Sequence, residues 1–314
     1  MDLPRHAYFM GKVVPFNDAK VSVATHAFNY GTAVFGGLRG YWNEEQKKLF
    51  VFRPLDHFHR LLNSAKMMCM EIPHSSESLI TIMLELLAAD GWQRDIYLRP
   101  LIYKSDLGIG VRLHDLTDAF TIFALPYEQY MKNETNAHVT ISSWRRVDDN
   151  VIPARGKVSG AYANSALIKT EAARAGFDEA LVLTQDGHVS EGSAMNVFMM
   201  RDGILVTPPV TDNVLEGITR RSIIELAQNE LGLTVVERSI DRTELFIADE
   251  LFMTGTAAQI VAITRVDFRP VGTGAMGAVT TKLRLLYEDI LRGRNPKYAK
   301  WTVVVPQSQP IPTK

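Results

Sequence analysis

The chain has 314 residues, of which 46% are hydrophobic and 22% are charged, and its formal net charge is −1. A chain of this length can bury a large core and is expected to form two domains rather than one. The near-neutral charge gives no electrostatic hold on nucleic acid or on an anionic membrane, so neither partner is expected.

The single cysteine, Cys69, excludes an intrachain disulfide and a cysteine-cluster metal site, so no metal is expected. The first residues, MDLPRHAYFMGK, carry charge and lack an apolar segment of signal-peptide length. No stretch approaches the roughly 18 apolar residues of a membrane-spanning helix. We therefore expect a cytoplasmic protein.

Two short strands are predicted between residues 7 and 23, with Asn17 and Asp18 as the turn that separates them. In the next stretch, THAFNYGTAVFGGLRGYW, aromatic and β-branched residues are interrupted by four glycines, Gly31, Gly36, Gly37 and Gly40. This pattern indicates strand backbone that packs closely against a neighbouring group. A ligand is one interpretation, and a bent or bulged strand without a ligand is the simpler one.

Residues 53–70 and 75–89 are predicted as helices, the first because apolar residues recur at helical spacing and the second because a run of serines opens it. A strand is predicted at 95–103, and Arg99 lies within its apolar sequence. A buried arginine needs a partner. Arg99 therefore pairs either with a carboxylate of the protein or with an anion that enters a cavity.

A further strand is predicted at 120–125. The polar stretch 126–136 that follows has no apolar periodicity, which is typical of a linker. We therefore predict a domain at 1–125, an interdomain linker at 126–136 and a second domain at 137–314.

The second domain is predicted to open with a strand at 138–143 and to continue with VIPARGKVSGAYANSAL, in which Lys157 lies among small residues just before a helix at 163–175. An amine packed among small groups loses solvation and becomes a nucleophile toward carbonyls. A lone lysine is more often only a solvating charge, so Lys157 is a candidate because of its surroundings.

After a strand at 179–183, the pairs Asp186-Gly187 and Asp202-Gly203 indicate hairpins between β-rich segments. Glu191 lies in the step VSEGSAMN of this apolar region. It is either a solvated turn residue or a buried carboxylate, and a buried carboxylate would require a positive partner.

Two stretches indicate anion binding. Gly217 precedes a clear amphipathic helix that Gly232 ends, and free amides at such a helix start hold phosphate. The turn Thr254-Gly255-Thr256 places hydroxyls beside glycine, which is a weaker signal. The last helix is predicted at 280–294, and the proline-rich end is predicted to be a loose tail.

These segments together resemble the fold type IV pyridoxal-phosphate aminotransferases, particularly the branched-chain amino acid aminotransferases. The resemblance rests on Lys157 with Tyr162, the SEG step at Glu191, LEGITR and MTGTAA, and it extends through THAFNYG, VFGGLR, DHFHRL and YLRPL. It implies an α/β (α+β) fold, with a small α/β domain and a larger pseudo-barrel domain that hold pyridoxal 5′-phosphate between them. The implied reaction moves an amino group between leucine, isoleucine or valine and 2-oxoglutarate through a Lys157 Schiff base.

Position by position, the resemblance also implies contacts to the cofactor. Lys157 would carry the cofactor and move the proton of the substrate Cα, Tyr162 would hydrogen-bond the phenolic oxygen, and Glu191 would pair with the pyridine nitrogen. The phosphate would be held by Arg60, the backbone amides of Ile218 and Thr219, and the Thr256 hydroxyl.

The substrate pocket that the resemblance implies would be lined by Tyr30, Phe35, Gly37, Arg39, Tyr97, Arg99, Val111 and Tyr130. Val111 would reach in from a neighbouring subunit, which implies a homodimer or a dimer-based oligomer. Arg99, with tyrosine hydroxyls, would accept the distal carboxylate of glutamate. The amides around Thr256 and Ala257 would accept the α-carboxylate.

The chain departs from the family's pattern at three places. The usual Phe-Glu-Gly is Phe35-Gly36-Gly37 here, the linker tryptophan is Tyr127, and the run after SEG is Ser-Ala-Met-Asn. These changes bear on substrate range, because the cofactor positions are intact. Alternatives within the fold are a D-amino acid or (R)-amine transaminase and aminodeoxychorismate lyase, which eliminates pyruvate, and a catalytically inactive homologue is disfavoured.

Overall fold

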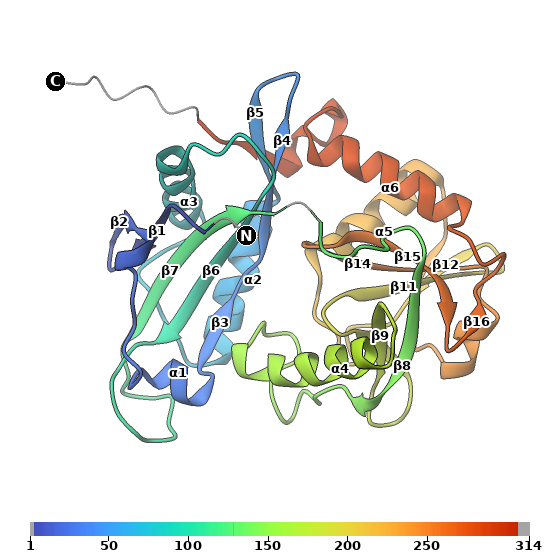
Figure 1. The fold of residues 1–314 in the computed structure, drawn as a ribbon, viewed down its shortest axis with the longest axis horizontal. Coiled ribbons are helices and arrows are strands. Elements are labelled where there is room, and N and C mark those ends of the chain that lie inside the picture. The colour runs from blue at the N-terminus through green and yellow to red at the C-terminus, as the bar shows by residue number, and fades with distance from the viewer. Residues whose placement is uncertain (1–2, 128, 307–314) are drawn as a thin grey trace. The chain divides into compact units, whose positions relative to one another are not determined.

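The computed structural model describes residues 3–127 and 129–306, and contacts divide the chain into two compact units (Figure 1). The first comprises Met1–Glu128, Gly156–Gly160 and Glu288–Lys314, and the second comprises Gln129–Arg155 and Ala161–Tyr287. The predicted domain boundaries stay predictions. Contacts group the stretch around Lys157 and the C-terminal stretch with the first unit.

The first unit is built on an eight-stranded sheet in the order β17-β5-β4-β6-β7-β1-β2, with β3 paired to β6. Its strands are β1 (His6–Phe9), β2 (Lys12–Pro15), β3 (Ala33–Phe35), β4 (Leu38–Asn43), β5 (Lys48–Phe52), β6 (Ile96–Lys104), β7 (Asp118–Pro126) and β17 (Thr302–Val304). Its helices are α1 (His26–Tyr30), α2 (Pro54–Met67) and α3 (Ser76–Asp90), with 3-10 turns η1 (Phe16–Asp18) and η4 (Pro296–Trp301). Neighbouring strands pair antiparallel, and short turns join β1 to β2 and β4 to β5.

Local signals explain both long helices of this unit. Helix α2 buries Phe58, Leu61 and Ala65 at helical spacing, as the prediction for 53–70 required. Helix α3 begins where the Ser75 hydroxyl accepts a hydrogen bond from the Ser78 amide, which confirms the helix predicted at 75–89.

The first hairpin turns earlier than predicted. Met10 and Gly11 have φ values of 51° and 81°, and Phe9 pairs with Lys12 across this tight turn. Asn17 and Asp18, the predicted turn, lie instead in η1, and no strand covers 20–23. The prediction was wrong because Asn-Asp is a strong turn signal, whereas Met-Gly is a weak one.

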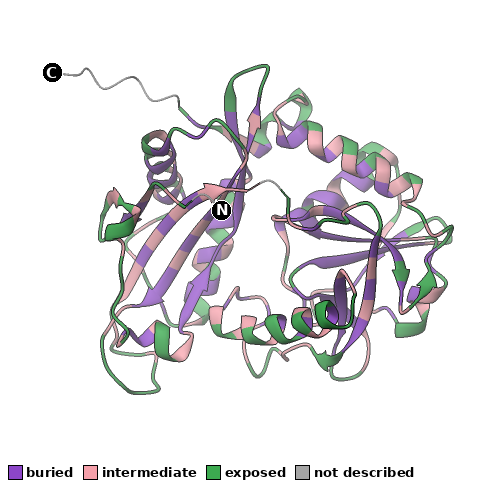
Figure 2. Cartoon of the chain, viewed as in Figure 1, coloured by how far each residue is buried: buried purple, intermediate pink, exposed green. Residues whose placement is uncertain are grey.

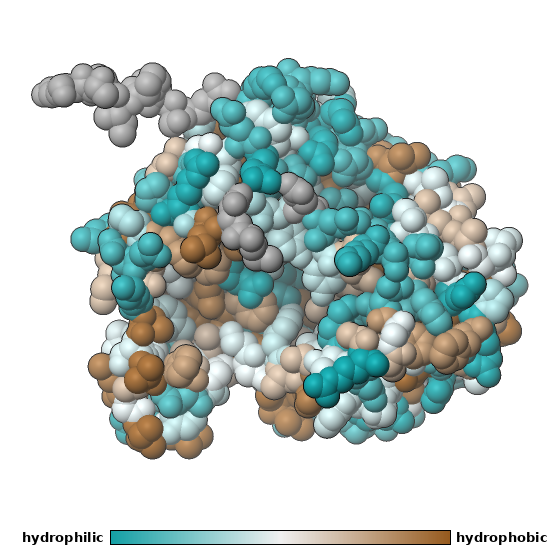
Figure 3. All heavy atoms as spheres, in the orientation of Figure 1, coloured by the Kyte–Doolittle hydropathy of each residue, from teal (hydrophilic) through white to brown (hydrophobic). Residues whose placement is uncertain are grey.

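The glycine-rich stretch after residue 24 begins as a helix rather than as a bent strand. Helix α1 ends at Gly31, whose φ of 67° is left-handed and whose amide donates to the Ala27 carbonyl. The strands β3 and β4 follow it. Exposed apolar side chains gather on α1 and the loops around it, at the lower left of the space-filling view (Figure 3).

The second unit is built on a nine-stranded sheet in the order β10-β9-β8-β15-β14-β11-β12-β13, with β16 paired to β15. Its strands are β8 (Ala137–Arg145), β9 (Glu179–Leu183), β10 (Val189–Gly192), β11 (Asn196–Arg201), β12 (Ile204–Thr207), β13 (Val235–Glu237), β14 (Glu250–Gly255), β15 (Gln259–Val266) and β16 (Arg269–Pro270). The helices in this part of the chain are α4 (Tyr162–Arg174), α5 (Ile218–Leu231) and α6 (Ala278–Leu291), with 3-10 turns η2 (Ser159–Ala161) and η3 (Arg242–Phe246). The residue ranges of η2 and α6 extend into the first unit.

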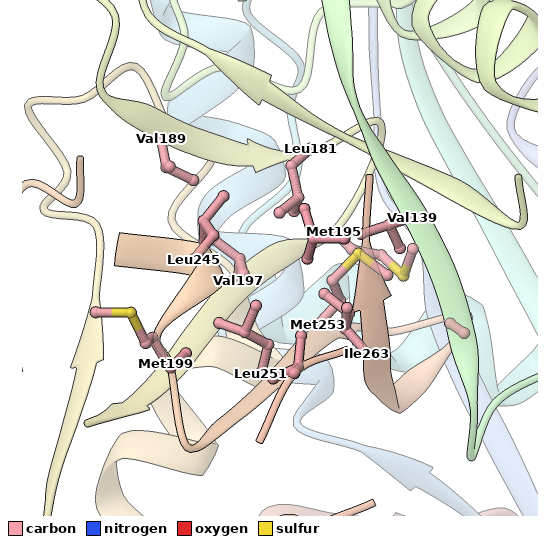
Figure 4. Packing of buried hydrophobic residues seen from close by; sticks show 14 of the residues in the cluster. Val139, Leu181, Val189, Met195, Val197, Met199, Leu245, Leu251, Met253 and Ile263 are labelled. Carbon is pink, nitrogen blue, oxygen red and sulfur yellow. The ribbon is translucent and has the colours of Figure 1, made fainter. Parts of the chain in front are cut away.

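The core of this unit is a cluster of aliphatic and methionine side chains contributed by several strands, including Val139, Leu181, Val197, Met253 and Ile263 (Figure 4). The central strands of both sheets are buried, whereas the helices keep exposed faces (Figure 2). Among the described residues, no helix is long and apolar enough to span a bilayer, and no cluster of His, Cys, Asp and Glu side chains suits a metal ion.

Most predicted elements of this unit are confirmed. Strand β9 and helix α4 match their predicted ranges within two residues, and both predicted hairpins connect antiparallel strands. Gly217 precedes α5, and Gly232 ends it with a φ of 65°. The predicted tail lies largely in 307–314, outside the described residues.

Candidate functional site

The backbone of Lys157 is fixed within the first unit by two hydrogen bonds. Its amide donates to the hydroxyl of Ser64 (3.1 Å), and its carbonyl accepts from the Phe35 amide (3.0 Å). Ser64 is fully buried on α2, and its hydroxyl donates to the Arg60 carbonyl (2.8 Å). Lys157 is therefore held by a helix on one side and a strand on the other.

The side chain of Lys157 lies against an aromatic ring. Its Nζ is 4.9 Å from the ring centre of Phe35, and Cζ of Arg99 is 4.5 Å from the same centre. A cation over an aromatic face is attracted by the ring's negative face. Phe35 thus brings a half-buried amine and a guanidinium onto one apolar surface.

Arg99 forms no ion pair with any carboxylate of the described residues. Its Nη2 donates to Oη of Tyr97 (3.2 Å), its Cζ lies 5.2 Å from the Tyr97 ring centre, and its Nε is buried without a hydrogen-bond partner. Of the two interpretations of Arg99 in the sequence, the pairing with a protein carboxylate is therefore absent. The guanidinium keeps donor capacity for an anion.

Gly37 allows Tyr97 to take this position. A Cβ on Gly37 would lie 2.1 Å from Oη of Tyr97, closer than any real contact. The ring of Tyr97 also packs on that of Tyr127, with centres 5.4 Å apart. The absence of a side chain at Gly37 thus leaves room for the Tyr97 hydroxyl at the position where Arg99 contacts it.

The charge of Arg39 is paired within the first unit. It is 2% exposed, its Nη2 lies 3.6 Å from Oδ2 of Asp95, and it donates to the Tyr127 carbonyl (3.0 Å). Its Cζ also lies 4.9 Å from the Tyr41 ring centre. Burial raises the pKa of the Tyr41 hydroxyl to about 12, so this ring stays neutral beside the arginine.

The remaining predicted residues of the first unit are Arg60, Tyr30 and Val111. Arg60 is half-buried and precedes Ser64 by one turn of α2, so both lie on one helix face. Oη of Tyr30 accepts from the Gly110 amide (3.1 Å). Val111 follows Gly110 and is 89% exposed.

Glu191 is a buried carboxylate of the second unit. Its Oε1 lies 3.0 Å from Nη2 of Arg146, and its Oε2 accepts from Nδ2 of Asn196 (3.1 Å) and from the Leu215 amide (3.2 Å). Arg146 in turn donates through Nε to the Asn213 carbonyl (3.1 Å). The interpretation of Glu191 as a solvated turn residue was wrong, because the side chain is only 5% exposed.

Arg146 was missed as a partner of Glu191 by the sequence analysis. Arg145 is the last residue of β8 and Arg146 follows it. The sequence alone does not show which of the two arginines is exposed and which is largely buried. The alternation of faces along a strand would have placed them on opposite sides, but it would not have chosen between them.

The N-terminus of α5 has no side-chain cap. Its N-cap is Gly217, which offers no side-chain cap, and Ile218 and Thr219 are buried in the first turn. Oη of Tyr287 lies 3.4 Å from the Thr219 hydroxyl. The positive end of a helix without a side-chain cap favours a bound phosphate.

Four further predicted residues and the neighbouring Thr254 lie in the second unit. Thr256 and Ala257 are half-buried in the turn between β14 and β15, Tyr162 opens α4, and Tyr130 packs against the core cluster. Thr254, which the sequence indicated only as part of the Thr254-Gly255-Thr256 turn, pairs with Asn196 across β14 and β11, and its buried hydroxyl has no hydrogen-bond partner among the described residues.

A sequence profile of the amino-transferase class IV family matches residues 34–266. The chain belongs to the class IV aminotransferase family. It is 43% identical over 299 residues to the probable branched-chain-amino-acid aminotransferase of Aquifex aeolicus, covering 95% of this chain and 96% of that one. It is 38% identical to the branched-chain-amino-acid aminotransferase of Escherichia coli K12, covering 94% and 96%.

Solved class IV aminotransferases are similar in structure as well. The branched-chain aminotransferase of Thermoproteus uzoniensis with norvaline has a TM-score of 0.92 at 39% identity and covers 96% of this chain and 100% of that one. The branched-chain amino acid aminotransferase of Thermobaculum terrenum in its PLP-form has a TM-score of 0.92 at 35% identity and covers 97% and 99%. The predicted family and its mixed α/β fold class are confirmed.

Proposed function

We propose that this protein is a branched-chain amino acid aminotransferase that moves the amino group between leucine, isoleucine or valine and 2-oxoglutarate, with pyridoxal 5′-phosphate as cofactor. The observation that carries the proposal is the ring of Phe35, which has Lys157 4.9 Å and Arg99 4.5 Å from its centre. An amine, which can react with carbonyls, and a cation without a carboxylate partner among the described residues thus border one apolar wall. The names of the similar enzymes point to the same reaction.

The groups present fit the cofactor. When bound, pyridoxal phosphate supplies a carbonyl for amines and a ring that accepts electrons. Glu191, buried and ionically paired, suits a protonated ring nitrogen, and the Gly217 start of α5 suits a phosphate. Arg60 and the Thr256 hydroxyl would complete the phosphate site, while Tyr162 would donate to the phenolic oxygen.

Lys157 would hold the cofactor covalently and would accept the proton of the substrate Cα on Nζ. Its backbone is pinned by Ser64 and Phe35, so only the side chain needs to move between these roles. The neutral form of this amine is the one that attacks a carbonyl.

The charged and polar groups of the site suggest which residues would bind the substrate carboxylates. Arg99 and the Tyr97 hydroxyl would bind the distal carboxylate of glutamate, and the amides of Thr256 and Ala257 would bind the α-carboxylate. A branched side chain would contact only the apolar wall. We include Tyr30, Phe35, Gly37, Arg39, Val111 and Tyr130 in this pocket on the family resemblance.

Val111 supports a homodimer, because its side chain is 89% exposed in the single chain and so packs on little of it. We propose a homodimer or a dimer-based oligomer, and a cytoplasmic location in keeping with a single free thiol. Size-exclusion chromatography with light scattering tests the first, and cell fractionation tests the second.

The activity test uses the purified protein with cofactor, leucine and 2-oxoglutarate. The proposal predicts glutamate formation at a rate far above that with D-leucine or an (R)-amine. A higher rate with either of the latter donors would instead favour the transaminases of opposite substrate handedness. Pyruvate released from aminodeoxychorismate without an amino acceptor would favour a lyase.

A further inference from the structure

The loop after β6 is held at Gly110 by two side chains of α1. Nε2 of His26 lies 2.8 Å from the Gly110 carbonyl oxygen, and the Gly110 amide donates to Oη of Tyr30 (3.1 Å). His26 and Tyr30 are separated by one helical turn, so they share a face, and their ring centres are 4.8 Å apart. Both backbone polar groups of Gly110 are therefore bound to α1.

The contacts assign the proton of the His26 ring. A carbonyl oxygen only accepts hydrogen bonds, so Nε2 carries a hydrogen and donates it in the hydrogen bond to the Gly110 carbonyl. The other nitrogen, Nδ1, lies 2.7 Å from Oγ1 of Thr32, whose hydroxyl can donate to it. His26 is 4% exposed, so water competes little for either contact. Thr32 thus holds the Nδ1 side of the ring while Nε2 binds the loop.

The anchored loop presents apolar side chains outward. Ile109 and Val111, the neighbours of Gly110, are 86% and 89% exposed, and Phe28 on α1 is 70% exposed. Exposed apolar side chains also gather over α1 and the loops around it (Figure 3). Side chains exposed to this extent pack on little of their own chain, so Val111 is available to contact a second copy.

We infer that His26 is a positioning residue that fixes Val111 for the substrate pocket of the partner subunit in the dimer. This inference rests on the proposed function and on the proposed dimer. Loss of the Nε2 donor leaves the Gly110 carbonyl without its partner and frees the residue next to it. The effect is on binding of the branched side chain, because Val111 carries no group that reacts.

The first test compares His26→Phe with His26→Gln. The phenyl ring keeps the bulk and removes both nitrogens, whereas the glutamine amide can still donate near the Nε2 position. We expect His26→Phe to raise the KM for leucine about three- to tenfold, the factor that one hydrogen bond commonly contributes, with little change in kcat. His26→Gln should restore part of this loss. An unchanged KM in His26→Phe would overturn the inference.

A second pair keeps His26 and changes the hydroxyl that contacts its Nδ1. Thr32→Val removes the hydroxyl at nearly constant volume, and Thr32→Ser retains it. Thr32→Val should raise the KM for leucine in the same direction, and Thr32→Ser should not. If His26→Phe is insoluble, the comparison of Thr32→Val with Thr32→Ser tests the inference instead. Equal KM values for the two variants would then contradict the role of the Thr32 contact in holding the His26 ring against the loop.

The action between subunits is tested with mixed dimers carrying two different affinity tags. One subunit carries Lys157→Ala with His26 intact, and the other carries Lys157 with His26→Phe. The working site then receives Val111 from the intact loop, so its KM for leucine should match that of the wild type. A KM as high as in the His26→Phe homodimer would show that the loop acts within its own chain, against the inference.

The anchor itself is tested without any activity. Arg112 lies in the exposed part of the loop, where trypsin can cleave after it. Cleavage at Arg112 should be faster in the His26→Phe holoenzyme than in the wild type, and an equal rate would refute the anchor. Absence of leucine transamination in the wild type would refute the proposed function instead, so the two failures are distinguishable.

Discussion

Nη2 of Arg146 lies 3.0 Å from Oε1 of Glu191, and both side chains are nearly inaccessible to water, at 11% and 5% exposed. The carboxylate also accepts from Asn196 and from the Leu215 amide, so its orientation is fixed by three donors from different segments. Each of them favours the ionised form of Glu191. The carboxylate that would face the cofactor nitrogen is therefore held before any ligand arrives.

Removal of Arg146 should damage both the fold and the reaction. Arg146→Leu leaves a buried carboxylate without its cation, which typically costs about 3 to 5 kcal/mol. We expect a lower midpoint in urea unfolding together with a lower kcat. Arg145→Leu is the matched control, because Arg145 is exposed on the same segment. Equal unfolding midpoints for the two variants would contradict the importance of the buried pair.

Glu191→Gln tests the carboxylate directly. The amide keeps the shape of the side chain but cannot keep a ring nitrogen protonated, so kcat should fall by several powers of ten from the roughly 10 s⁻¹ typical of enzymes. Cofactor affinity, measured by equilibrium dialysis, should fall much less. Turnover close to that of the wild type would remove Glu191 from this role.

Lys157→Ala should abolish the covalent attachment of the cofactor. We expect the purified wild type to be yellow and to lose this absorbance upon borohydride reduction, with the cofactor then fixed to the peptide that contains Lys157. The variant should show neither the absorbance nor the fixed label. Recovery of the label on another lysine in the wild-type digest would show that the assignment is wrong.

Local signals predicted much of the fold. The serine cap of α3 and the Gly217 and Gly232 ends of α5 are marked in the sequence, because caps are local interactions. The early hairpin at Met10 and Gly11 was not predicted, since the competing Asn-Asp pair is the stronger turn signal.

Contacts between distant segments set the limit on predicting the site. The sequence indicated that Glu191 required a cation if buried, but only the fold identifies Arg146. The sequence likewise left two interpretations of Arg99, and the register that places it beside Phe35 without a carboxylate is a property of the assembled sheet. The His26 anchor joins residues 84 positions apart and had no sequence signal.

Acid should weaken the second unit through Glu244. Hydrogen bonds from Arg238, helped by Arg201 and the Asp241 amide, lower the pKa of Glu244 from 4.5 to about 2. A lowered pKa in the folded state means that this stabilisation is full above pH 4.5 and is lost as the pH falls toward about 2. Glu244→Gln should lower the unfolding free energy above pH 4.5 and reduce its change over this window.

Urea unfolding of wild type and variant across the same pH range measures this effect. Glu237→Gln is the control, because the Glu237 side chain is 47% exposed and its ion pair is screened by water. A variant that loses as much stability upon acidification as the wild type would show that Glu244 does not carry the pH dependence.

Arg99 and Arg39 lie on adjacent strands, and we expect their replacement to have opposite effects on stability and substrate dependence. Arg39 is paired with Asp95 inside the unit, whereas Arg99 has no carboxylate partner among the described residues. Arg39→Leu should therefore lower thermal stability and reduce turnover of all substrates alike. Arg99→Leu should leave the melting temperature nearly unchanged.

The substrate dependence of Arg99→Leu decides how one pocket takes two amino acids. A charge-assisted hydrogen bond to the distal carboxylate of glutamate contributes about 1.5 to 3 kcal/mol, so kcat/KM for glutamate should fall ten- to a hundredfold or more. Leucine has no such carboxylate and contacts only the apolar wall, so its kcat/KM should fall much less. Single-turnover rates with each donor, measured beside a melting curve, separate these effects. Equal losses for glutamate and leucine would contradict the dual-substrate pocket and, with it, 2-oxoglutarate as the acceptor.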